Sequence, residues 1–321
     1  MKQIVLTETG GPESFSVRAA DLAPPGPHEI RIRNSAIGVN FIDIYQRRGL
    51  YPVATPCVLG QEGAGTVIAA GADQPFKTGD RVAYLSGGGA YAEEIVLDAG
   101  RAAPAPISVG VDEAAAGFLK GLTAEMLVRQ VFPLTQGRTA LVTAAAGGVG
   151  TLLVQWARHL GATIIAIVGG PEKAQAAAAN GADHTIDRYA TPDIASAVRT
   201  LTNGRGVDVV YDSVGAATFQ SSLDSLAIRG MMVTYGNASG PVPPIAPLEL
   251  SRRGSLSLIR PSLFHYSTPD RLPEMAAALF DLMGKGVLKP AVAARFPLEK
   301  AANAHRLLEA GKTIGSIVLK P

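Results

Sequence analysis

The feature that most constrains this chain is a glycine-rich turn, residues 144–150, set between two short apolar stretches. Residues 139–143 (TALVT) are apolar and rich in β-formers, a pattern typical of a parallel strand covered on both faces. From Thr151 apolar residues recur at helical spacing until Gly161, and residues 163–168 (TIIAIV) then predict a second buried strand. The sequence therefore predicts a strand–turn–helix–strand unit, the building block of a parallel α/β sheet.

The turn fits the dinucleotide-binding pattern G-x-G-x-x-G, with Ala145 in the place of the first glycine, followed by Gly147 and Gly150. Gly147 and Gly148 carry no Cβ, so the backbone can approach phosphate oxygens closely, and Gly150 permits close packing of helix on strand. The first N–H groups of a helix and its dipole favour an anion at that end. A glycine turn without a ligand is the alternative, but its context predicts a pyrophosphate site.

The end of the second strand indicates which nucleotide is bound. An NAD site usually has an acidic residue there, about 20 residues past the turn, to hold the ribose 2′-hydroxyl. Here residues 169–171 are Gly-Gly-Pro, and Lys173 follows, with Arg188 and Tyr189 after the third strand. Glu172 is a contrary sign that the dipole of the following helix explains. A missing acid with cations nearby leaves room for a 2′-phosphate, so the sequence predicts NADPH.

Length and composition limit the class of protein. A chain of 321 residues is long for one core and predicts two domains. The net charge of +2, without a basic block, argues against a nucleic-acid partner. The single cysteine, Cys57, excludes an intramolecular disulfide and a cysteine-rich zinc site. We find no signal peptide and no apolar run of about 20 residues, so no membrane association is expected and the expected location is the cytoplasm.

Short segments with strand character recur over roughly the first 120 residues, which predicts a small β-barrel. After the turn, residues 207–213 and 231–235 continue the parallel sheet, separated by a helix expected at residues 218–228. The last expected strand, residues 316–319, rejoins the N-terminal domain, so the nucleotide domain is an insertion. The expected domains are residues 1–122 with 263–321, and residues 123–262.

Five segments together resemble the zeta-crystallin-type quinone oxidoreductases of the medium-chain dehydrogenase/reductase superfamily. They are residues 38–45 (GVNFIDIY), 49–52 (GLYP), 118–124 (FLKGLTA), 144–150 (AAAGGVG) and 210–215 (VYDSVG). The resemblance covers the whole chain. It implies an α/β protein with a GroES-like β-barrel catalytic domain and a Rossmann domain, a doubly wound parallel sheet. It also implies NADPH, a homodimer, and hydride transfer to a quinone.

The zinc alcohol dehydrogenases of the same superfamily hold their metal partly through the histidine of a Gly-His-Glu sequence. The matching residues here are Gly60-Gln61-Glu62, and glutamine is a poor zinc ligand. Cys57 alone cannot form a site, and the five histidines are scattered. We therefore expect no metal. Reduction would then depend on the substrate's own electrophilicity, which quinones and activated enones provide.

The resemblance also implies the site residues. Asn40, Tyr45, Tyr51 and Thr123 would line the nicotinamide and substrate cleft as the catalytic set, with Asn40 and Thr123 also contacting the cofactor. The remaining expected cofactor contacts are Ala146, Gly147, Gly148 and Val149 at the pyrophosphate; Gly169, Lys173, Arg188 and Tyr189 near the 2′-phosphate; and Ser213, Tyr235, Gly236, Asn237 and Arg260.

Several of these residues have structural alternatives. Tyr45 and Tyr51 could simply pack at the domain edge, Asn40 could cap a turn, and Arg260 could form a structural ion pair. Relatives commonly have Asn-Tyr after the third Rossmann strand, whereas this chain has Asp-Arg-Tyr at residues 187–189, so either Arg188 or Tyr189 takes the role beside the phosphate.

The sequence as a whole predicts an NADPH-dependent quinone reductase that needs no metal. An oxyanion formed on the substrate could be stabilised by the Asn40 amide, a tyrosine hydroxyl or solvent. A reductase of conjugated C=C bonds in enals, enones or enoyl thioesters is the first alternative, because it uses the same hydride geometry. A non-catalytic role, crystallin-like or RNA-binding, is the second, and the weak net charge argues against RNA.

Overall fold

Two units account for residues 1–321, all of which the computed structural model describes. The first unit comprises Met1–Leu122 and Ser267–Pro321, and the second comprises Thr123–Tyr266. The second unit is thus inserted in the first. It ends after the short helix α8 (Leu263–Tyr266), beyond the expected limit at residue 262.

The second unit is built on a six-stranded sheet in which every neighbouring pair of strands is parallel. In spatial order the strands are β11 (His184–Asp187), β10 (Thr163–Val168), β9 (Thr139–Thr143), β12 (Val207–Asp212), β13 (Leu226–Thr234) and β14 (Ser257–Ile259). Numbered along the chain this is the order 3-2-1-4-5-6 of the Rossmann fold. The predicted doubly wound sheet is confirmed, with β9 and β10 at the predicted bounds.

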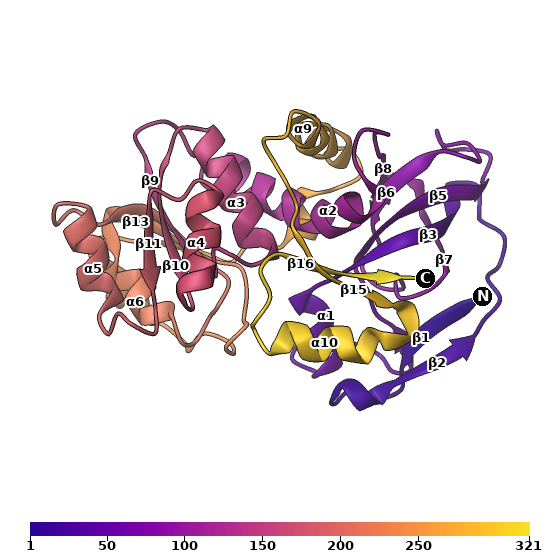
Figure 1. The fold of residues 1–321 in the computed structure, drawn as a ribbon, viewed down its shortest axis with the longest axis horizontal. Helices are drawn as coiled ribbons and strands as arrows, with labels where there is room; N and C mark the ends of the chain where they lie inside the picture. The colour runs from indigo at the N-terminus through magenta and orange to yellow at the C-terminus, as the bar shows by residue number, and fades with distance from the viewer. The chain divides into compact units, whose positions relative to one another are not determined.

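Helices cover both faces of this sheet. In Figure 1, α3 (Gly148–His159) and α4 (Pro171–Ala179) lie on one side of the strands, and α5 (Ile194–Leu201) and α6 (Phe219–Asp224) lie on the other. The connection between β13 and β14 contains α7 (Pro247–Arg252). Buried aliphatic residues of the strands, such as Leu141, Ile165 and Val210, form part of the core of this unit.

The prediction of a helix over residues 218–228 was wrong for the second half of that segment. The observed helix ends at Asp224, and β13 begins at Leu226, which pairs with Val207 of β12. Leu226 and Ala227 are buried within the sheet. Strand pairing therefore decided the structure of a segment whose local pattern also suits a helix.

The first unit contains a mostly antiparallel sheet of seven strands. Its order is β15 (Val292–Pro297), β16 (Ser316–Lys320), β3 (Glu29–Val39), β5 (Glu62–Ala70), β6 (Arg81–Leu85) and β8 (Ala102–Pro104), with β7 (Glu94–Asp98) also paired to β3. A smaller sheet joins β2 (Phe15–Ala19), β1 (Lys2–Leu6) and β4 (Cys57–Val58). The C-terminal strand β16 pairs with β3, which confirms that the last strand returns to the N-terminal unit.

Helices complete the first unit. They are α1 (Phe41–Arg47), most of α2 (Val111–Glu125), α9 (Leu272–Gly284) and α10 (Ala301–Glu309), with short 3-10 turns at Pro12–Ser14, Ala99–Arg101 and Leu298–Lys300. The boundary between the units falls inside α2, which continues into the π-helical segment Met126–Val131. No helix in the chain is both long enough and apolar enough to cross a bilayer.

Candidate active site

The glycine-rich turn lies between β9 and α3 in the second unit. Ala144 takes a left-handed conformation with φ of 48°, and Gly147 is the N-cap of α3. The N–H of Thr151 donates to the carbonyl of Gly147 at 2.9 Å, so the helix begins at Gly148, before the expected Thr151. The N–H groups of the first turn then have no acceptor within the helix, and no side chain caps it.

Gly150 is required by packing. A Cβ on Gly150 would lie 2.7 Å from Cα of Ala145, closer than real Cβ contacts. At Gly147 a Cβ would lie 3.2 Å from the carbonyl oxygen of Ala144, a tight but nearly tolerable distance. The backbone of the turn is thus packed closely against the start of α3, whose N-terminus has no side-chain cap. These features fit a pyrophosphate.

The ends of β10 and β11 bring a second group of predicted residues together. The two strands are paired in register, and the ring of Tyr189 lies against Gly169, where a Cβ would approach Cε2 of the ring to 2.8 Å. Arg188 Nη2 donates to the hydroxyl of Tyr189 at 2.6 Å, and the guanidinium carbon lies 4.5 Å from the ring centroid. Tyr189 is 73% exposed, so this pair stands at the surface.

Lys173, in the first turn of α4, belongs to the same group electrostatically. Burial lowers the pKa of Lys173, the Tyr189 hydroxyl raises it, and the Arg188 guanidinium lowers it further. Tyr189 and Arg188 therefore act electrostatically on Lys173. Two cations held near each other are stabilised by an anion between them, which suits a phosphate.

A third group lies where β12, β13 and β14 end. A Cβ on Gly236 would lie 2.8 Å from Cα of Ser213, so these two chain segments touch. Arg260 Nη1 donates to Thr234 Oγ1 at 3.0 Å and to the carbonyl of Gly236 at 2.9 Å. Arg260 therefore ties the end of β14 to that of β13. Tyr235 and Asn237 flank Gly236, half-buried and buried respectively.

Asp212 at the end of β12 supports this group, and the sequence analysis gave it no role. Its carboxylate is fully buried and accepts the N–H groups of Val214 (2.8 Å) and Gly215 (3.0 Å). It also accepts the hydroxyls of Thr218 and Ser222 at 2.6 and 2.7 Å. With these four donors, and Thr143 Oγ1 at 3.5 Å as a fifth, the carboxylate fixes the loop that follows Ser213. Its position between a buried strand and a glycine was the available signal.

In the first unit Asn40 is the N-cap of α1. Its backbone N–H donates to Asp43 Oδ2 at 2.8 Å, and its side-chain Nδ2 donates to Glu62 Oε1 at 2.9 Å. The capping alternative therefore holds for the backbone of Asn40, whereas its carboxamide is oriented by Glu62. The Nδ2 group has two protons. One is donated to Glu62, and the Gly38 carbonyl lies 3.5 Å from Nδ2, so the expected donation to a substrate oxyanion would compete with the weaker of these two contacts.

Glu62 forms a buried ion pair with Lys120 of α2, at 2.7 Å between Oε1 and Nζ. The other carboxylate oxygen accepts the N–H of Leu119 at 2.6 Å. Glu62 is 0% and Lys120 5% exposed. Sequence analysis missed this pair; a lysine in an apolar helical segment, FLKGLTA, was the only signal.

Tyr45 and Tyr51 contact each other, with ring centroids 5.3 Å apart at 65°. The N–H of Tyr51 donates to the carbonyl of Tyr45, and Phe41 lies on the other side of Tyr45 at 6.1 Å. This aromatic group supports the packing alternative for both tyrosines. Thr123, the remaining member of the expected catalytic set, is buried in α2 and belongs to the second unit.

A further polar network in the first unit connects α1 and α10 through Tyr91. The Tyr91 hydroxyl donates to Asp43 Oδ2 at 2.9 Å, so His305 Nε2, also 2.9 Å away, carries the proton that it donates to Tyr91. Burial raises the pKa of Asp43 to about 7. Burial, with a contribution from Arg47, lowers the pKa of His305 to about 3. Arg47 itself pairs with Glu309.

The donor set does not fit zinc. Gln61 is buried, and its Nε2 donates to Gln46 Oε1 at 3.0 Å. Cys57 is partly buried, and burial raises the pKa of its thiol, which disfavours the thiolate that binds metal. No three His, Cys, Asp or Glu side chains are grouped so that they could hold a metal ion.

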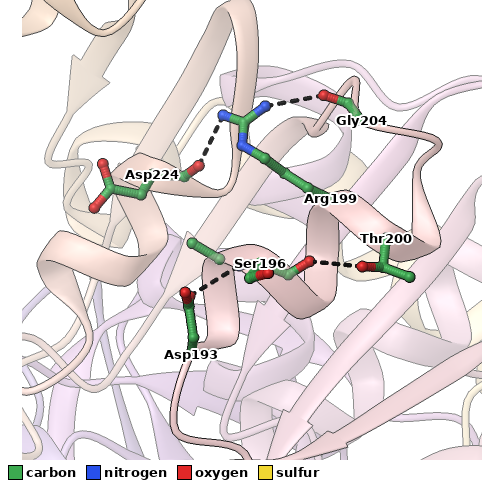
Figure 2. Close-up of a pocket in the computed structure, with 7 residues that line it drawn as sticks. Asp193, Ser196, Arg199, Thr200, Gly204 and Asp224 are labelled. Atoms are coloured by element: carbon green, nitrogen blue, oxygen red, sulfur yellow. Dashed lines mark hydrogen bonds between the residues drawn. The ribbon is translucent and has the colours of Figure 1, made fainter.

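A separate hollow of about 680 Å³ lies beside α5 (Figure 2). Its polar groups bond to one another: Arg199 donates to the carbonyls of Gly204 and Asp224, and Thr200 to the carbonyl of Ser196. Asp193 Oδ1 accepts the N–H of Ser196. These groups stabilise the end of a helix, and none of the predicted site residues lines the hollow.

Comparisons with known proteins agree with this geometry. The family described as Alcohol dehydrogenase GroES-like domain matches residues 26–107, and that described as Zinc-binding dehydrogenase matches residues 148–281. A quinone oxidoreductase from Pseudomonas aeruginosa is 48% identical, with coverage of 100% of this chain and 99% of the relative. A 2-haloacrylate reductase from a Burkholderia species is 44% identical, with coverage of 99% and 98%.

Solved structures give the same result. The crystal structure of Escherichia coli quinone oxidoreductase complexed with NADPH superposes with a TM-score of 0.97, at 42% identity, over 100% of both chains. Full-length identity at this level, with both domain families present in order, leaves one assignment. The chain belongs to the quinone oxidoreductases of the medium-chain dehydrogenase/reductase superfamily.

Proposed function

We propose that this protein is an NADPH-dependent quinone reductase that transfers hydride from NADPH to a quinone without a metal ion. The observation that carries the proposal is the glycine turn at the N-terminus of α3, in a chain that superposes over its full length on a quinone oxidoreductase crystallised with NADPH. The protein is an enzyme, and NADPH is its cofactor.

The second unit would bind most of the cofactor along the carboxyl ends of its strands, the usual ligand edge of such sheets. The turn formed by Ala146, Gly147, Gly148 and Val149 takes the pyrophosphate, because the N–H groups and dipole of α3 favour its charge. Ser213, Tyr235, Gly236, Asn237 and Arg260 border the cofactor's other half, where Arg260 and the packing of Gly236 on Ser213 hold three strand ends together.

Lys173 and Arg188 neutralise the 2′-phosphate in this proposal. The effect of the Arg188 guanidinium on the pKa of Lys173 supports a shared anion, and Gly169 leaves room for the ring of Tyr189. Of the two alternatives left open by the sequence, we assign the charge contact to Arg188. Tyr189 is given the role of orienting the guanidinium, because its hydroxyl accepts from Arg188 Nη2.

The bound cofactor supplies the hydride, and with it two electrons. We assign Asn40, Tyr45, Tyr51 and Thr123 to the surroundings of the nicotinamide and the quinone, where they would orient the acceptor and exclude water. Asn40 is held by Glu62 through its Nδ2, so its Oδ1 is the end directed away from that carboxylate. We therefore assign it to positioning, and the proton that completes the hydroquinone to solvent.

The test is a pair of assays on the purified protein. NADPH binding is measured first by titration, and NADPH oxidation is then followed with 1,4-benzoquinone. We expect binding and rapid oxidation with NADPH, and weak binding of NADH. Lys173→Ala should raise the KM for NADPH with little change in kcat at saturation. Protein that binds NADPH but oxidises none of it with benzoquinone contradicts the quinone assignment.

One observation favours a second activity, the reduction of a conjugated C=C bond. A relative at 44% identity, covering nearly the whole chain, is a 2-haloacrylate reductase. An activated alkene accepts hydride at carbon just as a quinone does, and needs the same cofactor. Turnover of 2-chloroacrylate or a 2-alkenal at a kcat/KM above that of benzoquinone would make this the main activity.

We also infer a cytoplasmic homodimer. Support comes from the edge strand β14, whose outer N–H and C=O groups are open to pairing, and from Ile228 on the neighbouring strand, which is 80% exposed. A second copy could cover both. Light scattering that gives the mass of one chain at micromolar concentration would remove the dimer from the proposal.

A further inference from the structure

Asp187, the last residue of β11, connects the two backbone segments that carry the cationic side chains. Its Oδ1 accepts the N–H of Gly170 at 3.0 Å and the N–H of Tyr189, also at 3.0 Å. β11 and β10 are paired, with Asp187 opposite Val168, so the carboxylate lies directly beside the end of β10. A single oxygen thus joins the loop after β10 to the loop after β11.

Each of these segments carries one phosphate-binding group of the proposed site. Gly170 is the N-cap of α4, and Lys173 lies in the first turn of that helix. Tyr189 follows Arg188 and accepts its hydrogen bond. Gly170 has a φ of 98°, a conformation that costs glycine little and therefore does not by itself fix the loop. The bond from Gly170 to Asp187 supplies that constraint.

The carboxylate carries a charge of the wrong sign for a site that binds phosphate. A negative group there weakens anion binding unless its geometric contribution is larger than its repulsion. The two backbone donors partly offset the charge. Asparagine could accept the same two bonds through its Oδ1 without any charge, which separates the two effects experimentally.

We propose that Asp187 is a positioning residue for NADPH selectivity, which holds the α4 N-terminus and the Arg188 loop at the separation that one phosphate bridges. The inference rests on the proposed 2′-phosphate site. Asp187 contacts the cofactor only through the segments that it ties together. Its contribution therefore belongs to NADPH and not to NADH, which lacks the 2′-phosphate.

Asp183 provides a matched control at the opposite end of the same strand pair. It precedes β11, and its Oδ2 accepts the N–H of Ile164 in β10 at 2.8 Å. Its Oδ1 accepts from Arg158 Nη1 at 3.1 Å. Asp183 therefore ties β10 to β11 as Asp187 does, but at the amino ends of the strands, away from the proposed site.

The experiment measures the Kd of NADPH and of NADH by fluorescence titration of the full chain and its variants. Asp187→Ala should weaken NADPH binding by about tenfold or more, the equivalent of about 1.4 kcal/mol for a lost bond, and change NADH binding by less than about threefold. Asp187→Asn should bind NADPH as tightly as the natural chain or more tightly. Asp183→Ala should leave the ratio of the two affinities unchanged.

The remaining outcomes overturn the inference. Equal losses for NADPH and NADH in Asp187→Ala, or the same selectivity loss in Asp183→Ala, would mean that the carboxylate only stabilises the sheet. A larger loss for NADH would mean that Asp187 binds the ribose hydroxyl itself. If Asp187→Ala does not fold, Asp187→Asn is measured instead, and a tenfold loss of NADPH affinity in that variant refutes the positioning role. Unchanged NADPH affinity in Lys173→Ala and Arg188→Ala would instead refute the phosphate site.

Discussion

The two units organise their polar groups in opposite ways. In the second unit the candidate ligand-binding groups are backbone N–H groups at one contiguous turn and side chains near the surface, such as Arg188 and Tyr189. In the first unit Glu62, Lys120 and Asn40 are buried and bond to one another, as do Asp43, Tyr91 and His305. The first arrangement can bind a ligand, whereas in the second most polar side-chain atoms have partners within the protein, Asp43 Oδ1 and His305 Nδ1 being the exceptions.

Because of this difference, polar groups in the second unit should contribute mainly to ligand binding and those in the first unit mainly to the stability of the fold. A group that faces a ligand can be removed with loss of binding and little loss of fold, whereas a member of a closed buried network leaves its partner uncompensated. Changes in the first unit should therefore appear first as lost stability, and changes at the turn as lost cofactor affinity. Substitutions in the two units test that division, and their effects should decrease in the order given.

Lys120→Met should have the largest effect, because it leaves the Glu62 carboxylate buried without its cation. We expect a loss of about 3–5 kcal/mol in the free energy of unfolding. The single tryptophan, Trp156, lies buried in α3 of the second unit. Urea unfolding followed by circular dichroism should shift more than unfolding followed by tryptophan fluorescence. The double variant Glu62→Gln/Lys120→Met should recover part of the loss. Equal unfolding midpoints for the natural chain and Lys120→Met would refute a structural role for the ion pair.

Gly150→Ala should come next, because the new Cβ would press on the backbone of Ala145. Forcing the turn from the helix should cost about 1–3 kcal/mol. We expect this to appear as a tenfold or larger rise in the Kd of NADPH by titration. Gly284→Ala, at the end of α9, is the control, since a Cβ there would lie no closer than 4.0 Å to Ser108 Oγ and Gly284 takes no part in the proposed site. Comparable losses in both variants would argue against packing as the cause.

His305→Gln should change the pH dependence of stability. In the folded chain the pKa of His305 is lowered from 6.5 to about 3, so the unfolded state binds a proton first as pH falls. Stability contributed by the neutral imidazole is present above about pH 6.5 and is lost as pH falls toward 3. Glutamine can still donate to Tyr91 but does not titrate. Thermal melting between pH 7 and about pH 4 should therefore fall less steeply in the variant than in the natural chain.

Asp43 gives the opposite dependence and serves as the check on that interpretation. Its pKa is raised from 3.8 to about 7, so its contribution to stability is lost as pH rises through that interval. His305→Gln should leave this loss of stability at rising pH unchanged, and Asp43→Asn should remove it. If His305→Gln removed both the loss of stability at low pH and the loss at rising pH, the two groups would titrate as one unit.

The smallest effect is expected for Lys285→Met. Lys285 pairs with Asp281 one turn earlier in α9, and both side chains are largely exposed. Exposed pairs of this kind contribute less than about 1 kcal/mol, so the melting temperature should change by a few degrees at most. Lys120→Met is the same substitution in a buried pair, so the difference between the two variants measures how much burial adds to the cost of losing an ion pair.

Several parts of the fold followed from local patterns. The bounds of β9 and β10 and the glycine turn were predictable because strand burial, turn chemistry and helix periodicity all act over a few residues. The segment at residues 225–228 was assigned to a helix because its pattern suits either structure; pairing of Leu226 with Val207 decided it. The role of residues 188 and 189 stayed open for the same reason, since the hydrogen bond between their side chains is not written in the spacing.

A Rossmann unit with an anion site at the start of a helix follows from local sequence alone, because a contiguous stretch supplies every backbone group that the site needs. The contact of Glu62 with Lys120, that of Tyr91 with His305, and the link that Asp187 makes between two loops depend on how the chain packs. The first two pairs are 58 and 214 residues apart in the chain. Side-chain partners at such distances depend on how strands and helices pack, and no local propensity encodes that packing.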